Sequence, residues 1–333
     1  MTLKEMVFAL SSAKGVTGLD GALKVAEAFL APLGEVATDN AGGITCTIGN
    51  GARRVMLDAH IDEIGFVVTA LEDGFIRVGK CGGIDARTVI GLRVTVHGKK
   101  DISGVVSSMP PHLKKESTDA PKIEELVIDC GLPAETVNDI VCTGDRISFD
   151  CEPAELLNGR ITGKSLDNRV GVAAIIEAAK QVSQKNADIT LILSLSAQEE
   201  LGLRGARTAT YALKPHEAIV VDVSFGDGAG LSDKECGKLG EGVMIGASPI
   251  LNKAMTDKMK ALAKEHNIPY QIEAMGGSTG TNADVVTINC EGVPTALLSI
   301  PLRNMHTCCE VVDIKDIEST VGLITAYICG GAV

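Results

Sequence analysis

The chain has 333 residues, of which 45% are hydrophobic and 22% are charged, and its formal net charge at pH 7 is −12. This size allows a full hydrophobic core and favours one large domain with a smaller one. The acidic balance argues against nucleic acid and against an anionic membrane surface as partners, because both bind basic faces. No stretch reaches the roughly 18 apolar residues that a membrane-spanning helix needs, so we expect no membrane partner.

The amino-terminal segment and the cysteines predict a cytoplasmic location. Lys4 and Glu5 precede only a short apolar stretch, which is atypical of a signal peptide. The ten cysteines are scattered without a Cys-x-x-Cys pair, and a chain of this length needs no disulfide framework. We therefore expect reduced, mostly buried thiols. Cys308 and Cys309 lie close to a histidine discussed below, so a metal-ligand role is the alternative to buried filler.

The first half of the chain changes from helical to β patterning. Helical periodicity covers residues 4–32, with an interruption at Gly15–Gly18, and residues 39–43 predict a turn into β structure. A first strand is predicted at about Val55–Ala59. From Phe66 to about Phe149, short alternating segments with hairpin signals predict a small β domain inserted into a larger one.

After Gly163 the predicted strands alternate with predicted helices. Apolar runs predict strands at residues 189–195, 218–221 and 295–299, and helical periodicity predicts helices at about residues 168–182, 205–212, 253–265 and 314–328. This alternation is typical of an α/β domain with a mixed, largely parallel central sheet and helices on both faces.

The candidate functional residues gather where the predicted strands end. In an open α/β sheet, ligands bind at the carboxyl ends of the strands, so side chains at those ends converge at one rim. Asp167, just before a predicted helix, is placed to join them. The residues that follow the strands are His60, Asp62, Glu199, Glu200, Asp222 and His306.

Two imidazoles and several carboxylates suit borderline divalent ions such as zinc or cobalt. Two ions that share a bridging carboxylate form a pair about 3.5–4 Å apart, which polarises a carbonyl and makes hydroxide available near neutral pH. A free carboxylate must still carry the proton from water to the leaving amine. The Glu199-Glu200 doublet fits, because neighbours in an extended segment point to different sides. One can bind metal while the other stays free.

Each of these residues also has an ordinary structural interpretation. A single histidine such as His60 or His306 is more often a satisfied polar residue than a ligand, and Asp167 is placed to be a helix N-cap. The glutamate doublet would be a solvated loop, and Asp222 a turn residue. These explanations do not account for the shared position of all the residues at strand ends or helix starts.

At these residues the sequence closely resembles metallopeptidase family 42, the cocatalytic aminopeptidases that include glutamyl aminopeptidases and proteins once labelled endoglucanases. The matching motifs cover nearly the whole chain. They are Gly15–Gly18, Ala59–Phe66, Gly82–Asp85, Pro110–Leu113, Ile128–Gly131, Ser165–Gly171, Gln198–Gly202, Val221–Val223 and Ser299–His306.

The resemblance implies two divalent ions per chain, zinc or cobalt, with manganese also possible. It implies Glu199 as the general base, and it implies that Asp62 accepts a hydrogen bond from the far nitrogen of His60 and fixes its tautomer. A structural salt bridge is the alternative for Asp62. The implied metal ligands are His60 and Asp222 for one ion, Glu200 and His306 for the other, and Asp167 as the bridge.

The resemblance also implies the domain organisation and the assembly. Residues 1–65 and 160–333 would form the catalytic metallopeptidase domain, and residues 66–159 an inserted, PDZ-like dimerisation domain. Dimers would assemble into a hollow dodecamer that admits short peptides. Asn304, the loop Gly276–Asp284 and the missing proline after Asp222 depart from the family pattern, and they leave the preferred amino-terminal residue open.

Two other functions compete with a metallo-aminopeptidase. A related metal hydrolase would be a deacylase, a carboxypeptidase or an endoglucanase, but a glycosidase needs only two carboxylates and would leave His60 and His306 without a task. A non-catalytic assembly protein that retains the fold would be favoured by the loss of Glu199 or of a ligand, and none is missing.

Overall fold

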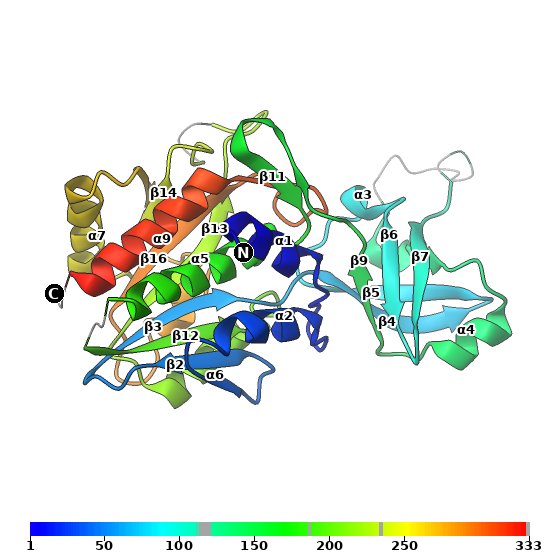
Figure 1. Cartoon of the computed structure of the whole chain (residues 1–333). Coiled ribbons are helices and arrows are strands. Elements are labelled where there is room, and N and C mark those ends of the chain that lie inside the picture. Colours follow the sequence, from blue (N-terminus) through cyan, green and yellow to red (C-terminus); the bar gives the residue numbers. More distant parts are fainter. Residues whose placement is uncertain (111, 113–120, 186–187, 233–235, 331–333) are drawn as a thin grey trace.

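The computed structural model describes residues 1–110, 112, 121–185, 188–232 and 236–330 (Figure 1). Its larger part is built on an eight-stranded sheet. The strand order is β1 (Glu35–Thr38), β2 (Ile44–Ile48), β12 (Ile189–Ser196), β3 (Arg53–His60), β13 (Glu217–Phe225), β16 (Thr295–Leu302), β14 (Val243–Ala247) and β15 (Tyr270–Ala274).

The sheet is mixed, as predicted. Strands β12, β3, β13 and β16 are parallel to one another in the middle of the sheet, while β2 and β14 pair antiparallel with this central group. Every residue of β12 and β16 is buried. Continuous apolar strands are expected where helices cover both faces of a sheet.

Helices cover both faces. Figure 1 shows α5 (Leu166–Ser183) and α9 (Ile314–Cys329) across one face, with α1 (Leu3–Ser12) beside α5. On the same side, α2 (Gly21–Leu30) packs on β2, and α7 (Lys253–Glu265) packs on α9. The short α8 (Ala283–Val286) and α6 (Arg204–Leu213) contact the opposite face, where they enclose a separate apolar cluster. None of the helices in the described ranges is both long and apolar enough to cross a bilayer.

The inserted segment forms a closed six-stranded barrel beside the sheet domain (Figure 1). It has its own core, in which Phe66 and Phe149 pack edge to face with ring centres 5.3 Å apart. A PDZ-like character of this insert stays a prediction. The barrel order is β4 (Gly65–Glu72), β5 (Phe75–Cys81), β8 (Val127–Asp129), β7 (Asp101–Ser107), β6 (Arg93–His97) and β9 (Arg146–Phe149), and the short helices α3 (Ala86–Val89), η2 (Ile123–Glu125) and α4 (Ala134–Ile140) lie between strands.

A small three-stranded sheet links the return of the insert to the carboxyl-terminal part of the chain. It consists of β10 (Ala154–Glu155), β11 (Arg160–Gly163) and β17 (Glu310–Asp313), with η3 (Leu157–Gly159) between the first two. In this sheet Gly163 is paired with Glu310. The pairing brings the start of α5 next to the segment that follows β16.

Three expectations need correction. The strand at residues 55–59 is not the first, because β1 and β2 precede it, and β1 is an edge strand with mostly exposed side chains. Asp222 does not end its strand, since β13 continues to Phe225. All ten thiols are free, but Cys46, Cys81 and Cys308 are the only buried ones, so the expectation of mostly buried thiols is wrong. Part of the motif Pro110–Leu113 lies outside the described residues.

Candidate metal centre

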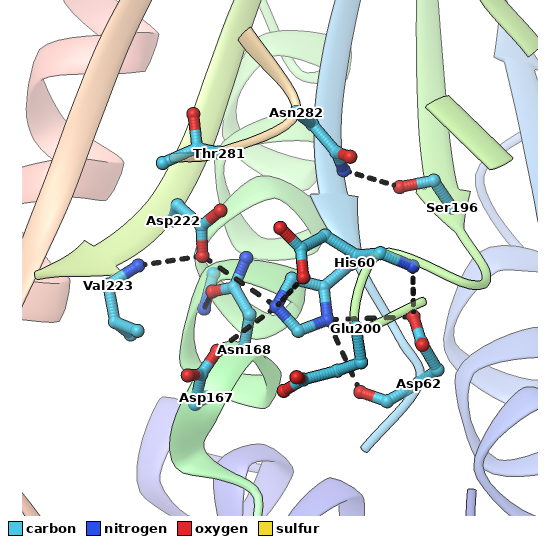
Figure 2. A network of polar contacts seen from close by, with 12 residues as sticks. His60, Asp62, Asp167, Asn168, Ser196, Glu200, Asp222, Val223, Thr281 and Asn282 are labelled. Carbon is cyan, nitrogen blue, oxygen red and sulfur yellow. Dashed lines mark hydrogen bonds and ion pairs between the residues drawn. The ribbon is translucent and has the colours of Figure 1, made fainter. Parts of the chain in front are cut away.

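The predicted polar residues meet at the carboxyl edge of the central parallel strands. Figure 2 labels His60, Asp62, Asp167, Glu200 and Asp222 among them. His60 is the last residue of β3 and is buried, with 1% of its surface exposed. Its Nε2 lies 3.0 Å from Oδ1 of Asp167 and 3.7 Å from Oδ1 of Asp222. His60, Asp167 and Asp222 therefore present three donor atoms to one point, and these atoms lie within 4.8 Å of one another.

The second histidine completes a second group around the same aspartate. Nε2 of His306 lies 3.4 Å from Oδ2 of Asp167 and 3.4 Å from Oε1 of Glu200. Asp167 thus turns one carboxylate oxygen toward each histidine. This is the arrangement that a bridging ligand requires, and it joins the two groups into one centre.

The backbone at the start of α5 places Asp167. Its φ and ψ are −73° and 105°, so it is not helical, and the Asp167–Asn168 peptide is cis. The side-chain amide of Asn168 donates to the carbonyl of Val221 at 2.8 Å, and its Oδ1 accepts from the N–H of Gly171 at 3.1 Å. A Cβ at Gly171 would lie 2.2 Å from that oxygen. The start of α5 is thereby fastened beside Asp222.

Glu199 and Glu200 lie in a turn after β12 rather than in the extended segment that we expected. Oε2 of Glu199 is 4.0 Å from Nε2 of His60, whereas Glu200 contacts His306. The ion-pair contacts of the two carboxylates are thus with different histidines of one cluster. A third possible donor group, His60 with both glutamates, follows from the same turn.

Asp62 holds the backbone of Glu199. Its Oδ1 accepts a hydrogen bond from the N–H of Glu199 at 3.0 Å, and its Oδ2 accepts one from the hydroxyl of Thr17 at 3.3 Å. Nδ1 of His60 is 3.7 Å from the Asp62 carboxylate but 3.3 Å from the Asp62 main-chain oxygen. The main-chain carbonyl is thus the nearer acceptor for this ring nitrogen.

Glu310 also belongs to the centre, although it was not among the residues predicted from the sequence. Its carboxylate accepts hydrogen bonds from the N–H of Asp167 at 3.1 Å and from the N–H of His306 at 3.0 Å, and only 2% of the residue is exposed. It therefore fixes the backbone of two proposed ligands at once. A sequence signal exists, because an acidic residue opens the apolar run Val311-Val312 four positions after His306.

The barrel also reaches the centre. Gly82 and Gly83 follow β5, and a Cβ at Gly83 would lie 2.5 Å from Nδ1 of His306. Gly82 has a φ of +85°, and a Cβ there would lie 2.9 Å from Oε2 of Glu200. The absence of side chains at this turn allows it to pack directly on the second donor group.

Buried charges join the neighbouring chain segments. Glu63 accepts hydrogen bonds from the N–H of Gly15 at 2.6 Å, from Nζ of Lys164 at 2.5 Å and from the hydroxyl of Ser165. Arg169, which is fully buried, lies so close that a Cβ at Gly15 would be 2.2 Å from its Nη2. This close packing leaves no room for a side chain at Gly15, the first residue of the Gly15–Gly18 motif.

The loop Gly276–Asp284 is anchored under the centre. Nδ2 of Asn282 donates to Oδ2 of Asp58 at 2.8 Å and to the hydroxyl of Ser196 at 2.8 Å. Within the loop, the N–H of Thr279 donates to Oδ1 of Asp284 at 2.7 Å. Burial raises the pKa of Asp58 to about 6, although its hydrogen bonds oppose this shift. The loop that departs from the family pattern is therefore hydrogen-bonded to β3 through Asn282 and Asp58.

The pKa shifts describe a site crowded with negative charge. Burial raises the pKa of Glu200 to about 7 and that of Asp222 well above its usual range. The hydrogen bond to Asp167 raises the pKa of His306 to about 9. Burial alone would lower the pKa of His60, but the surrounding carboxylates outweigh it and raise that pKa. Such a site gains from positive charge, as divalent ions supply.

The donor set fits divalent ions. Imidazole nitrogens and carboxylate oxygens with one shared aspartate suit two borderline ions such as zinc or cobalt. In the part of the chain that the structure describes, no cysteine belongs to the three possible donor groups. The structure thus brings together every residue for which the sequence predicted a ligand or catalytic role.

Known proteins share this fold and are similar to the chain in sequence. An aminopeptidase from the archaeon Desulfurococcus kamchatkensis superposes with a TM-score of 0.92 at 30% identity, covering 99% of this chain and 95% of that one. The TET1 peptidase of Pyrococcus horikoshii, which can assemble into a tetrahedron or a large octahedral shell, gives a TM-score of 0.88 at 28% identity, with coverage of 98% and 99%.

Sequence comparison agrees. The lysyl aminopeptidase of Pyrococcus furiosus is 36% identical over 303 residues, which cover 88% of this chain and 86% of that protein. The sequence profile of the M42 glutamyl aminopeptidases matches residues 42–323. These matches confirm the resemblance drawn from the motifs, and the chain belongs to the M42 glutamyl aminopeptidase family.

Proposed function

We propose that the protein is a metal-dependent aminopeptidase that removes amino-terminal residues from short peptides. The observation that carries this proposal is the position of Asp167, which turns one oxygen to His60 and the other to His306. The relatives named above are aminopeptidases or peptidases, which supports the same reaction class. The names lysyl and glutamyl aminopeptidase indicate that relatives differ in the amino-terminal substrate residue that they prefer.

Two divalent ions would be held by the residues that the resemblance implied. His60 and Asp222 would bind one ion, Glu200 and His306 the other, and Asp167 both, with zinc or cobalt as the ions and manganese as an alternative. When bound, such ions polarise the scissile carbonyl and lower the pKa of water. Glu310 would keep Asp167 and His306 in position through their backbone N–H groups.

Glu199 is the proposed general base. Asp62 holds its backbone N–H, which leaves the carboxylate facing the cluster beside His60. Burial raises the pKa of Glu199, and a general base works best when its pKa lies near the working pH. In this role the carboxylate takes the proton from water and passes it to the departing amine.

The insert, residues 66–159, is the proposed dimerisation domain, while residues 1–65 and 160–333 form the catalytic domain. Support for assembly comes from the shells formed by the Pyrococcus horikoshii relative. We propose that this protein also assembles, as a dodecamer built from dimers. A closed shell would restrict substrates to short, unfolded peptides.

A related metal hydrolase, such as a deacylase or a carboxypeptidase, would use the same two donor groups. Activity assays must therefore also include N-acylated amino acids and peptides that a carboxypeptidase cleaves. An endoglucanase would need only a pair of carboxylates around a sugar and would give the two histidines no task. A non-catalytic assembly protein would need neither the base nor the shared aspartate.

The test compares Glu199→Gln with Glu200→Gln in protein reloaded with zinc, cobalt or manganese. General acid–base catalysis contributes about 10²- to 10⁴-fold in rate, so Glu199→Gln should lose at least about 100-fold in kcat and keep its metal. Glu200→Gln should lose activity and one equivalent of metal. A Glu199→Gln protein within a few-fold of wild type on aminoacyl p-nitroanilides would refute the assigned base.

A further inference from the structure

The strand at the edge of the sheet carries a carboxylate that reaches inward. Glu273 lies on β15 and is half-buried. Its Oε2 accepts a hydrogen bond from the hydroxyl of Ser299 on β16 at 2.6 Å, and its Oε1 accepts one from the hydroxyl of Ser224 on β13. The side chain therefore lies over the sheet and not toward the solvent at its edge.

These two serines place Glu273 beside the proposed metal centre. Ser299 is the partner of Asp222 in the parallel register of β16 and β13, so both side chains point to the same face, on strands about 4.8 Å apart. Ser224 is two residues after Asp222 on β13 and shares that face. The carboxylate of Glu273 is thus hydrogen-bonded to two of the side chains next to Asp222.

The loop that follows β15 also leads toward Asp222. Figure 2 shows Thr281 and Asn282 next to Asp222 and His60. Both residues belong to the loop Gly276–Asp284, which begins shortly after β15 ends at Ala274. The carboxyl end of β15, where Glu273 lies, therefore leads into the loop that reaches the metal centre.

The charge of Glu273 is not balanced by a cation. Its two partners are neutral hydroxyls, and among the residues that the structure describes no lysine, arginine or histidine forms an ion pair with it. The carboxylates of Asp62, Asp167, Glu199, Glu200 and Asp222 would supply five negative charges when ionised, more than two divalent ions neutralise. Glu273 and these carboxylates together would therefore attract a positively charged ligand.

We propose that Glu273 recognises the side chain of the substrate's amino-terminal residue and selects lysine or arginine. This inference rests on the proposed aminopeptidase function and names its substrate class. Ser224 and Ser299 hold the carboxylate in place, so that an ammonium or guanidinium group can form a charge-assisted hydrogen bond with it. The alternative is a purely structural role, in which Glu273 only ties β15 to β16 and β13.

The experiment compares two substrates that differ in one charged group. Lysyl and norleucyl p-nitroanilide have side chains of similar length, but only lysine carries the ammonium. Wild-type protein should favour the lysyl substrate in kcat/KM. Glu273→Gln should reduce the lysyl-to-norleucyl ratio by about 10- to 100-fold, as expected for the loss of a hydrogen bond between charged groups. Glu273→Ala provides the same comparison if the glutamine variant folds poorly.

The matched control is Glu265→Gln, which removes the same charge from an exposed position at the end of α7. It should leave the ratio unchanged. If Glu273 is only structural, the variant melts earlier and loses activity on both substrates equally, and the unchanged ratio overturns the inference.

A binding measurement separates this inference from the proposed function. Lysine hydroxamate and norleucine hydroxamate are titrated calorimetrically into metal-loaded protein, which requires no turnover. Tighter binding of the lysine compound that is lost in Glu273→Gln supports the inference even if neither p-nitroanilide is cleaved, a result that would instead refute the aminopeptidase proposal. Equal binding of both hydroxamates to wild-type protein overturns the inference, whatever the activity.

Discussion

The carboxylate of Glu310 accepts a hydrogen bond from the backbone N–H of Asp167 at 3.1 Å. The other oxygen of the same carboxylate accepts one from His306 at 3.0 Å. The carbonyl of a glutamine can accept only one of these bonds well, because its amide nitrogen is a donor. We expect Glu310→Gln to weaken metal binding by about 10- to 100-fold, the usual effect of losing a group that orients ligands.

Calorimetric titration of metal-free protein with zinc measures this change directly. Glu318→Gln, an exposed substitution on α9, is the control and should bind zinc as wild type does. If Glu310→Gln binds both ions with unchanged affinity, its hydrogen bonds serve the fold and not the metal centre.

Asp167 should determine the metal content of the whole centre. Because one oxygen faces each histidine, Asp167→Ala should lose both ions, whereas Asp222→Ala should lose one. Elemental analysis of metal-saturated, gel-filtered protein should give close to two equivalents for the wild type. A well-folded Asp167→Ala protein that retains two equivalents would exclude the bridging role.

Metal binding should release protons and strengthen as the pH rises. The pKa of His306 is raised to about 9 and that of Glu200 to about 7, so at pH 7 in the metal-free protein His306 is protonated and Glu200 about half protonated; the pKa of His60 is raised in the same direction. A metal ion binds their deprotonated forms. The apparent affinity should therefore increase between pH 6 and pH 9, by about tenfold per unit for each displaced proton.

Calorimetry in buffers of different ionisation enthalpy counts the released protons. More than one proton should be released at pH 7, and fewer at pH 9. A pH-independent affinity over this range would mean that the two histidines are already neutral before metal arrives.

The turn from the barrel should be sensitive to a single methyl group. A Cβ at Gly83 would lie 2.5 Å from Nδ1 of His306, closer than side chains pack, so Gly83→Ala must displace the imidazole. We expect loss of one metal equivalent and at least a tenfold loss in kcat/KM, because ligand geometry tolerates little misplacement. Gly322→Ala on α9, where the nearest atom is 3.6 Å away, should retain metal and activity.

Assembly should be visible in solution. Among the residues that the structure describes, the barrel is closed by the pairing of β4 with β9, so none of its strands is an edge strand and we expect it to associate mainly through side chains. Size-exclusion chromatography with light scattering should report a particle far larger than a monomer when metal is present. A monomer at micromolar concentration would refute the proposed dodecamer.

Much of the sheet domain was predictable because its strands and helices carry local signals. The buried run of β12 and the long apolar pattern of α5 appear in the sequence at nearly their observed bounds. By contrast, β1 and β15 lie at the edges of the sheet and carry exposed or alternating side chains. A short edge strand is defined by its partner strand, which sequence periodicity does not show.

The proposed ligands were also easier to predict than their supports. His60 and the glutamate doublet follow apolar strands, which is a local signal. The place of Asp222 inside β13 was missed because the apolar run ends at Val221, whereas pairing with β16 continues to Phe225. Glu310 acts through backbone groups 143 and 4 positions away, and such contacts depend on the tertiary fold alone.

The hydrogen bonds of Glu63 with Lys164 and Ser165 join the point where the chain enters the barrel to the point where it returns. Phe66 and Ile147 are paired partners just beyond this junction, so a short linker there could replace the barrel without moving the sheet domain. The barrel could therefore be deleted or exchanged for another domain at this junction. Its removal would also withdraw the Gly82-Gly83 turn from His306 and Glu200. If the barrel is the proposed dimerisation domain, the remaining sheet domain would then act on larger substrates and bind metal less tightly.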